Sequence, residues 1–131
     1  MINVCNYSKQ IYDEFSFYHR LEKHMDVGAV LIKLKANSMA NVEAWQQELN
    51  ARKDEAIETL KAEGVYVESW FHVQLEGQDY LIAYMRAVDI PRAQQIGRES
   101  SFPIDQMHKQ FKKNWEKGYR ATLLVDLENT Q

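Results

Sequence analysis

A chain of 131 residues fits one domain, and its apolar fraction of 45% and charged fraction of 27% are those of an ordinary globular protein. The net charge of -3 is spread along the chain, which argues against nucleic-acid binding, and no stretch approaches the roughly 20 apolar residues of a membrane span. The single cysteine, Cys5, cannot form an internal disulfide, so we expect a cytoplasmic protein, and the N-terminus lacks the apolar run of a signal peptide.

Residues 1–26 are expected to form a helical extension. From Ser8 to Met25 the apolar side chains recur at helical spacing and make one stripe. Such a stripe packs on the domain or on a partner subunit, or covers a pocket as a lid.

Residues 27–131 are predicted to form the folded domain, which begins with a strand and a helix. Residues 27–35 are rich in β-branched side chains, and the alternate positions from Gly28 to Leu34 form a wholly apolar face. Residues 36–63 carry a helical apolar stripe and are predicted to form one long helix. Ser38 or Asn41 is expected to cap this helix, and Gly64 to end it in a left-handed conformation.

A hairpin follows, with strands at 65–75 and 79–87 around a tight turn that contains Gly77. Alternation assigns one row of side chains to the helices: Val65, Val67, Ser69, Phe71, Val73 and Leu75, with Leu81, Ala83 and Met85. It assigns a second, mixed polar and aromatic row to the other face of the sheet: Tyr66, Glu68, Trp70, His72 and Gln74, with Tyr80, Ile82, Tyr84 and Arg86.

The last part of the chain is predicted to contain a broken helix and a closing strand. Asp89 is a suitable N-cap, and residues 100–103 interrupt the helical pattern. A second apolar stripe then runs to Trp115, Gly118 is expected to end the helix, and residues 119–127 are predicted to form the final strand.

The predicted order is therefore β, α, β, β, α, β, which is an α+β, ferredoxin-like arrangement with an antiparallel sheet and helices on one face. The other face would expose many apolar and aromatic side chains. Because such patches mark binding surfaces, we expect a homodimer in which two sheets face each other in an α+β barrel. In a monomer, residues 1–26 would have to cover this face instead.

Several segments resemble a family of small uncharacterised bacterial proteins. The segments are EGVYVESWF at 63–71, YLIAYMRAVD at 80–89, FPIDQMHKQF at 102–111 and the helical stretch WQQELNARKDEAIETLKAEG at 45–64. The resemblance covers roughly residues 28–128, and it implies a ferredoxin-like, dimeric α+β barrel fold. The wider superfamily includes cofactor-free monooxygenases, haem-dependent enzymes, isomerases and regulatory modules, so the resemblance implies no single activity.

The mixed row of the hairpin contains the first candidate site. We expect Glu68 as a base or hydrogen-bond acceptor and His72 as a group that exchanges protons near neutral pH. Ligand-binding residues would be Tyr66, Trp70, Tyr84 and Arg86. The alternative is a Glu68–Arg86 ion pair and aromatic packing in a dimer interface.

His108, on the stripe between Met107 and Phe111, is the second candidate. It is either a buried histidine with one hydrogen bond or a catalytic group at the edge of a pocket, with Asp105 one turn away to orient it. A metal site of Glu68, His72 and His108 requires these three to converge in space. No histidine pair has metal-binding helical spacing, so neither a metal nor a cofactor is predicted.

The sequence therefore predicts a small-molecule-binding, homodimeric α+β barrel. If the protein is an enzyme, we expect a cofactor-free enzyme of monooxygenase or isomerase type. The alternative is a regulatory or protein-interaction module whose polar sheet face forms the dimer interface. Neither nucleic acid nor a membrane is an expected partner.

Overall fold

The computed structural model describes residues 25–129. Within this range the order of elements matches the predicted α+β pattern. The strands are β1 (Asp26–Leu34), β2 (Val65–Leu75), β3 (Gln78–Ala87) and β4 (Trp115–Arg120). The helices are α3 (Met39–Ala51), α4 (Lys53–Glu63), α5 (Ile90–Glu99) and α6 (Pro103–Phe111), followed by a 3-10 turn, η1 (Lys112–Asn114).

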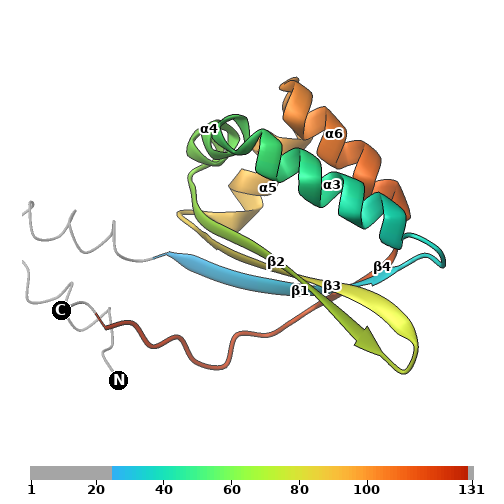
Figure 1. The fold of residues 1–131 in the computed structure, drawn as a ribbon. Coiled ribbons are helices and arrows are strands. Elements are labelled where there is room, and N and C mark those ends of the chain that lie inside the picture. Colours follow the sequence, from blue (N-terminus) through green and yellow to red (C-terminus); the bar gives the residue numbers. More distant parts are fainter. Residues whose placement is uncertain (1–24, 130–131) are drawn as a thin grey trace, which may run out of the picture.

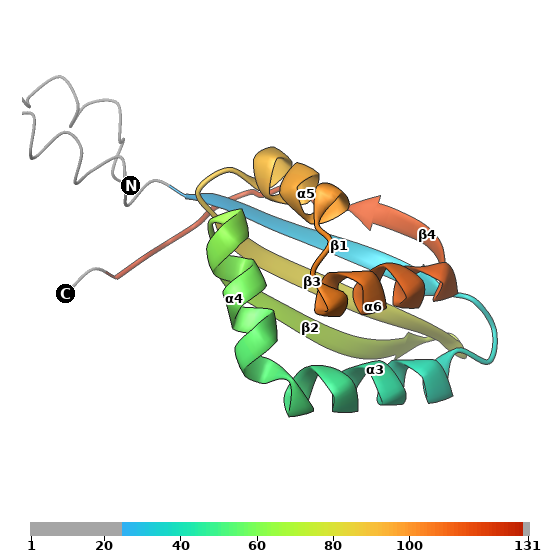
Figure 2. The same cartoon turned by 90° about the horizontal axis from the view of Figure 1, so that it is seen from above.

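The strands form one antiparallel sheet in the order β2-β3-β1-β4. All four helices of residues 25–129 cover the same face of this sheet, and none of them lies on the opposite face, which we call the open face (Figures 1 and 2). The chain after β4, residues 121–129, is here named the C-terminal segment, and it runs below the open face in Figure 1. Its first residue continues the pairing of β4, because Ala121 N donates to Ala29 O at 2.9 Å.

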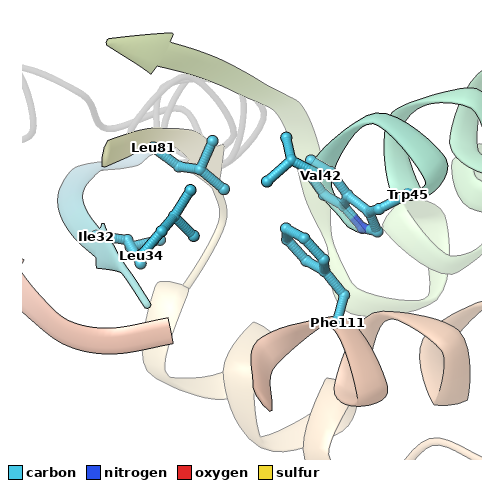
Figure 3. Packing of buried hydrophobic residues seen from close by; sticks show 6 residues of the cluster. All are labelled: Ile32, Leu34, Val42, Trp45, Leu81 and Phe111. Carbon is cyan, nitrogen blue, oxygen red and sulfur yellow. The ribbon is translucent and has the colours of Figure 1, made fainter. Parts of the chain in front are cut away.

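The main core lies between the sheet and the helix pair α3 and α6. Its buried members come from strands and helices that face each other (Figure 3): Ile32, Leu34, Val42, Trp45, Leu81 and Phe111. The rings of Trp45 and Phe111 stack with centroids 4.2 Å apart and planes inclined by 6°. These contacts confirm the buried alternate face of the first strand, since Ile32 and Leu34 are each only 2% exposed.

A smaller core joins α5 to the other end of the sheet. Val65, Ala87 and Ala93 are buried there, and Ile90 packs beside them. Gly28 is part of this contact, because a Cβ at this position would lie 2.9 Å from Ile90 Cδ1. The position therefore allows α5 to approach β1 closely.

The predicted long helix at 36–63 is in fact two helices that meet at a sharp angle (Figure 2). Arg52 leaves the helical conformation, with φ -113° and ψ 37°. Its guanidinium spans the break, with Nε 2.5 Å from Glu55 and Nη1 3.4 Å from Glu48. The apolar stripe is interrupted between Leu49 and Ala56, so no buried contact holds one straight helix across this polar stretch.

The end of the last helix was also predicted too late. Helix α6 ends at Phe111, and Trp115 and Gly118 lie in β4 rather than in or after the helix. Asn114 stops the helix in two ways: its side chain donates to Phe111 O at 2.9 Å, and its carbonyl accepts from Lys35 N at 2.8 Å. The predicted strand at 119–127 is therefore displaced toward the N-terminus, and most of that range is the C-terminal segment.

The turn and cap signals were read correctly in three places. Gly64 ends α4 in the left-handed conformation with φ 73°, and the Asp89 carboxylate caps α5 by accepting from Arg92 N at 3.0 Å. The hairpin turn has positive φ at Glu76 and Gly77. Ser38 lies at the start of α3, but its hydroxyl donates to Lys35 O rather than capping the helix.

The predicted helical extension at 1–26 lies almost entirely outside the described residues, which begin at Met25 with β1 starting at Asp26. In the described range, no helix has the length and apolar character needed to cross a membrane.

Candidate functional site

Strand β2 contains one extra residue near its start. Val65 pairs with Ala87, but Val67 already pairs with Arg86, so Tyr66 forms a bulge. Because side chains alternate along a strand, one inserted residue moves every later side chain to the opposite face. The faces assigned to β2 by simple alternation are therefore inverted from Val67 onward.

The bulge divides the predicted hairpin site between the two faces of the sheet. Glu68, Trp70 and His72 lie on the helix side of the sheet. Their cross-strand neighbours are the inward-facing residues of β3: Met85, Ala83 and Leu81. Tyr84 and Arg86 belong to the open face, and Tyr66, in the bulge itself, is 62% exposed. The prediction that all these side chains share one face is wrong.

The predicted apolar row of β2 is corrected in the same way. Val65, before the bulge, is buried as expected, whereas Val67, Phe71 and Leu75 are 41%, 55% and 46% exposed. These side chains give the open face an apolar character instead of packing under the helices.

His108 lies in a cluster of aromatic rings between α3, α6 and the sheet. Its Nδ1 accepts a hydrogen bond from Trp45 Nε1 at 3.3 Å. The centroids of the Trp70, Trp45 and Trp115 rings lie 5.4, 5.9 and 6.1 Å from that of the imidazole. With Nδ1 as acceptor, the neutral ring carries its proton on Nε2.

Burial lowers the pKa of His108 to about 4, with a smaller contribution from the positive charge of Lys112. The imidazole is therefore neutral at pH 7. A neutral ring with a satisfied Nδ1 among tryptophans favours the interpretation of His108 as a packed core histidine, and its catalytic role stays a prediction.

His72 lies farther along β2 toward the hairpin turn, away from this aromatic cluster. Its Nε2 is 2.8 Å from Asp79 Oδ1, and 40% of its side chain is exposed. Among residues 25–129, no group of three or more His, Cys, Asp or Glu side chains is arranged to hold a metal ion. The convergence of Glu68, His72 and His108 that a metal site would need is thus not found.

A cleft with a volume of about 290 Å³ opens between α4, α5 and the connection to α6. We call it the acidic cleft, because its lining includes three carboxylates beside small and apolar side chains: Thr59, Ala62, Glu63, Ile96, Glu99, Ser100, Ser101, Phe102 and Asp105. The connection is held by Lys109, whose Nζ donates to the carbonyls of Arg98 and Ser100 at 2.8 and 3.1 Å.

Glu63 is the chemically unusual group in this cleft. It is the last residue of α4, and its carboxylate lies against α5, since a Cβ on Gly97 would be 3.3 Å from Glu63 Oε2. Burial, followed by the negative charges of Asp105 and Glu68, raises the pKa of Glu63 to about 7. Within residues 25–129 no hydrogen bond or ion pair compensates this carboxyl, so it exchanges protons near neutral pH.

Glu68 and Asp105 complete the same electrostatic environment. Glu68 is exposed as a residue, but the burial of its carboxyl raises its pKa, and the charge of Asp105 adds to this. The Trp70 indole N–H favours the charged form of Glu68, although the two groups do not meet the geometry of a full hydrogen bond. Asp105 was predicted to orient His108, but its carboxylate accepts a hydrogen bond from Ser100 Oγ instead.

The sequence does indicate that Glu63 is unusual, although neither strand alternation nor a motif singles it out. Helical spacing from Ala56 and Leu60 reaches position 63 one turn later, which places a carboxylate on the buried side of α4. An acidic residue in an apolar stripe is unusual, because burying a carboxylate without a partner is costly.

The open face combines exposed apolar side chains with the ion-paired Arg86. Arg86 forms a two-contact ion pair with Asp126 of the C-terminal segment, at 2.6 and 3.2 Å, and its guanidinium lies 5.9 Å from the centroid of the Tyr84 ring. Tyr119 on β4 is 43% exposed. The predicted Glu68–Arg86 pair is wrong, because the two side chains lie on opposite faces.

Comparison with known proteins identifies a family and a fold. Residues 25–131 match the model of a family described as "Family of unknown function (DUF6176)". A solved structure of a dimeric ferredoxin-like protein from an uncultured marine organism is similar, with a TM-score of 0.55, 14% sequence identity and coverage of 84% of this chain and 96% of that chain. At this identity the likeness shows the ferredoxin-like fold alone. None of the curated proteins compared with the chain is similar to it.

Proposed function

Because the chain belongs to the DUF6176 family, whose function is unknown, we propose a function from its own geometry: a homodimer that binds a small polar molecule in the acidic cleft of each subunit. One observation carries the binding proposal. Glu63 places a carboxyl with a pKa of about 7, and with no hydrogen-bond or ion-pair partner in residues 25–129, at the wall of a cleft of about 290 Å³. A cleft with a titratable group shifted toward neutrality is the preferred candidate for a ligand site.

The lining indicates which ligands suit the cleft. Three carboxylates face it, from Glu63, Glu99 and Asp105, and Ile96 and Phe102 supply apolar surface. A small organic molecule with an amino group or several hydrogen-bond donors would satisfy these oxygens, whereas an anion would be repelled.

If the protein is an enzyme, proton transfer is the chemistry that the site supports. A carboxyl with a pKa near 7 can accept and return a proton at physiological pH, which suits an isomerase without a cofactor. Of the three catalytic residues predicted from the sequence, Glu68 is electrostatically coupled to Glu63, whereas His72 and His108 belong to other surroundings. A role for Glu68 as a second acceptor therefore remains part of the proposal.

The binding proposal is tested by ligand retention. Native mass spectrometry of the purified protein should detect a retained small molecule. In thermal-shift measurements with small amines and matched carboxylic acids, only the amines should raise the melting temperature. Glu63→Gln should abolish this shift, whereas Glu43→Gln, at an exposed position of α3, should preserve it. Equal shifts for the two variants, or stabilisation by carboxylic acids alone, would overturn the assignment of the cleft.

The homodimer is supported by the open face. Apolar and aromatic side chains remain exposed there, including Tyr66, Val67 and Phe71, and large apolar patches mark interaction surfaces. The similar solved structure is described as dimeric. If two open faces meet around a twofold axis, the same patch is buried twice, and the interaction-module alternative shares this interface.

The dimer is tested by its mass in solution. Light scattering coupled to size-exclusion chromatography should give twice the chain mass of 15.4 kDa. Phe71→Asp should yield monomers, whereas Ile57→Asp, at an exposed apolar position on α4, should leave the dimer intact. A monomeric wild-type chain would refute the dimer and favour coverage of the open face by residues 1–24.

A further inference from the structure

The C-terminal segment leaves an unusual number of large aliphatic side chains in solvent. Leu124 is 91% exposed and Leu127 74%, and the neighbouring Leu123 and Val125 are 54% and 55% exposed. Single exposed leucines are common on protein surfaces, but four aliphatic residues within five positions form a continuous apolar strip.

This strip is held in place by two fixed contacts. At its start, Ala121 N donates to Ala29 O at 2.9 Å, and near its end Asp126 pairs with Arg86 at 2.6 and 3.2 Å. Arg86 belongs to the open face, so the pair holds the segment on the side of the sheet along which it runs in Figure 1. The leucines are therefore presented from a fixed position.

A second unpartnered apolar surface lies on the same face of the sheet. It belongs to β2, the edge strand farthest from β4, where Tyr66, Val67 and Phe71 are exposed. The C-terminal segment comes from the opposite edge, beside β1, and reaches Arg86 on β3. One chain thus carries two separate apolar surfaces on one face, and neither covers the other.

We propose that the C-terminal segment of each protomer packs, through Leu124 and Leu127, on the exposed β2 surface of its partner. This inference rests on the proposed homodimer and identifies what the partner contributes to it. A twofold axis makes such contacts reciprocal, because the segment of one chain meets β2 of the other and the reverse contact follows by symmetry. One twofold arrangement then buries both the leucines of the C-terminal segment and the exposed side chains of β2. A second copy of this chain is therefore the partner that fits both surfaces.

The contribution of the segment is tested by sedimentation equilibrium of three proteins. Leu124→Ser/Leu127→Ser should raise the dimer dissociation constant by about 100-fold, because truncation of two buried apolar anchors typically costs this much, about 2.8 kcal/mol at 25 °C. Val88→Ser, at an apolar position that is 57% exposed between β3 and α5, is the matched control and should leave the constant unchanged. Both leucines are exposed in the single chain, so the circular dichroism spectrum and melting of the monomer should not change.

The outcomes separate this inference from the proposed dimer. Suppose that wild type is dimeric, that Phe71→Asp dissociates it, and that the dissociation constant of the leucine variant equals that of Val88→Ser. The C-terminal segment then does not contribute to the interface, and the inference is overturned while the proposed dimer stands. If wild type is monomeric, both proposals fail together.

Placement on β2 is tested by cross-linking in a Cys5→Ser background. Mixed Leu124→Cys and Phe71→Cys chains should form a covalent heterodimer under mild oxidation, and Leu124→Cys mixed with Ile57→Cys should not. Equal cross-linking of the two mixtures would overturn the placement.

Discussion

The two faces of the sheet are built from the same strands but hold different kinds of residue. On the helix side, Trp45, Trp70 and His108 form a packed aromatic cluster beside an acidic cleft, and the ionisable groups there have shifted pKa values. On the open face, Arg86 has a charged partner, and the apolar side chains are left exposed. The helix side therefore combines the core of the domain with its titrating groups, whereas the open face keeps exposed apolar side chains and is the proposed dimer interface.

This difference separates two functions that the sequence had placed together. The predicted site joined Glu68 and His72 to Tyr84 and Arg86, which would have made pocket and dimer interface compete for the same side chains. Because the bulge at Tyr66 divides these residues, the proposed ligand site and the proposed dimer interface lie on different faces of the sheet. Changes on one face should then leave the property of the other face intact.

The largest expected effect is the loss of a core aromatic on the helix side. Trp45 is 6% exposed, stacks on Phe111 and donates to His108. Trp45→Ala should lower the free energy of unfolding by about 3–5 kcal/mol, because it removes buried area and leaves a cavity. Urea denaturation measures this, with Phe71→Ala on the open face as the control.

The Phe71→Asp chain is expected to be monomeric, so its side chain at position 71 makes no contact with a partner. At concentrations where Phe71→Ala is also monomeric, the free energies of unfolding of the two variants should differ by less than about 1 kcal/mol. If these open-face variants destabilise the single chain as much as Trp45→Ala does, the two faces do not differ in the way described.

The second effect is the acid sensitivity of His108. Its folded pKa of about 4 lies below the ordinary value of 6.5, so the unfolded chain binds this proton first as the pH falls. The stability present above pH 6.5 is then lost progressively toward pH 4, by about 2–3 kcal/mol at pH 4.5. His108→Gln should remove this loss, measured as the difference between urea midpoints at pH 7 and 4.5.

Met107→Leu on the same helix changes the packing without removing a titrating group, and it should keep the wild-type difference between the two pH values. A His108→Gln protein that loses as much stability in acid as wild type would show that the imidazole is not protected by burial.

The third effect has the opposite sign and belongs to Glu63. Its folded pKa of about 7 lies above the ordinary 4.5, so the folded chain holds the proton longer, and stability falls as the pH rises from 4.5 through 7. Glu63→Gln should therefore raise the free energy of unfolding at pH 8 and change it little at pH 4.5. We expect a gain of about 1–2 kcal/mol, below the roughly 3.4 kcal/mol of a fully buried carboxyl with this pKa, because solvent screens the half-buried side chain. Glu58→Gln, with an exposed carboxylate on the same helix, should not show this pattern.

Between pH 4.5 and 6.5 the two groups act in opposite directions on the free energy of unfolding. As the pH falls, His108 lowers it and Glu63 raises it. If Glu63→Gln lowered stability at pH 8, the carboxyl would have a compensating partner, and its assignment as the proton-exchanging group would fail.

Much of the fold could be predicted because its signals are local. The alternation of Ile32 and Leu34, the left-handed Gly64 and the Asp89 cap each depend on a few neighbouring residues, and all three are confirmed. The end of α6 depends instead on a contact between distant residues, Asn114 with Lys35, which periodicity does not contain. The break at Arg52 has a local cause, the polar stretch between Leu49 and Ala56, which the continuous helical prediction passed over.

The site was less predictable because one inserted residue decides it. The sequence VYVESWF departs from simple alternation only at Ser69 and the adjacent Trp70 and Phe71, and neither departure identifies Tyr66 as a bulge. Its cause is tertiary: Val65 must pack against Ala93, while Trp70 must reach Trp45 from the same side of the strand. Val65 and Trp70 are five positions apart, and in a regular strand only positions an even number apart share a face. The extra residue of the bulge therefore brings both side chains to the helix side.

The smallest expected effect concerns the pair that holds the C-terminal segment on the open face. Arg86 and Asp126 are partly exposed and also close to Tyr84, so single substitutions mix several interactions. A double-mutant cycle with Arg86→Leu and Asp126→Asn, made in the Phe71→Asp monomer, should give a coupling energy of about 0.5–1 kcal/mol that decreases with added salt. The single-contact pair of Lys33 with Glu116, at 3.0 Å, is the reference cycle and should couple more weakly. Equal coupling in the two cycles would mean that Arg86 does not fix the segment, and the leucines would then not be presented to a partner from a defined position.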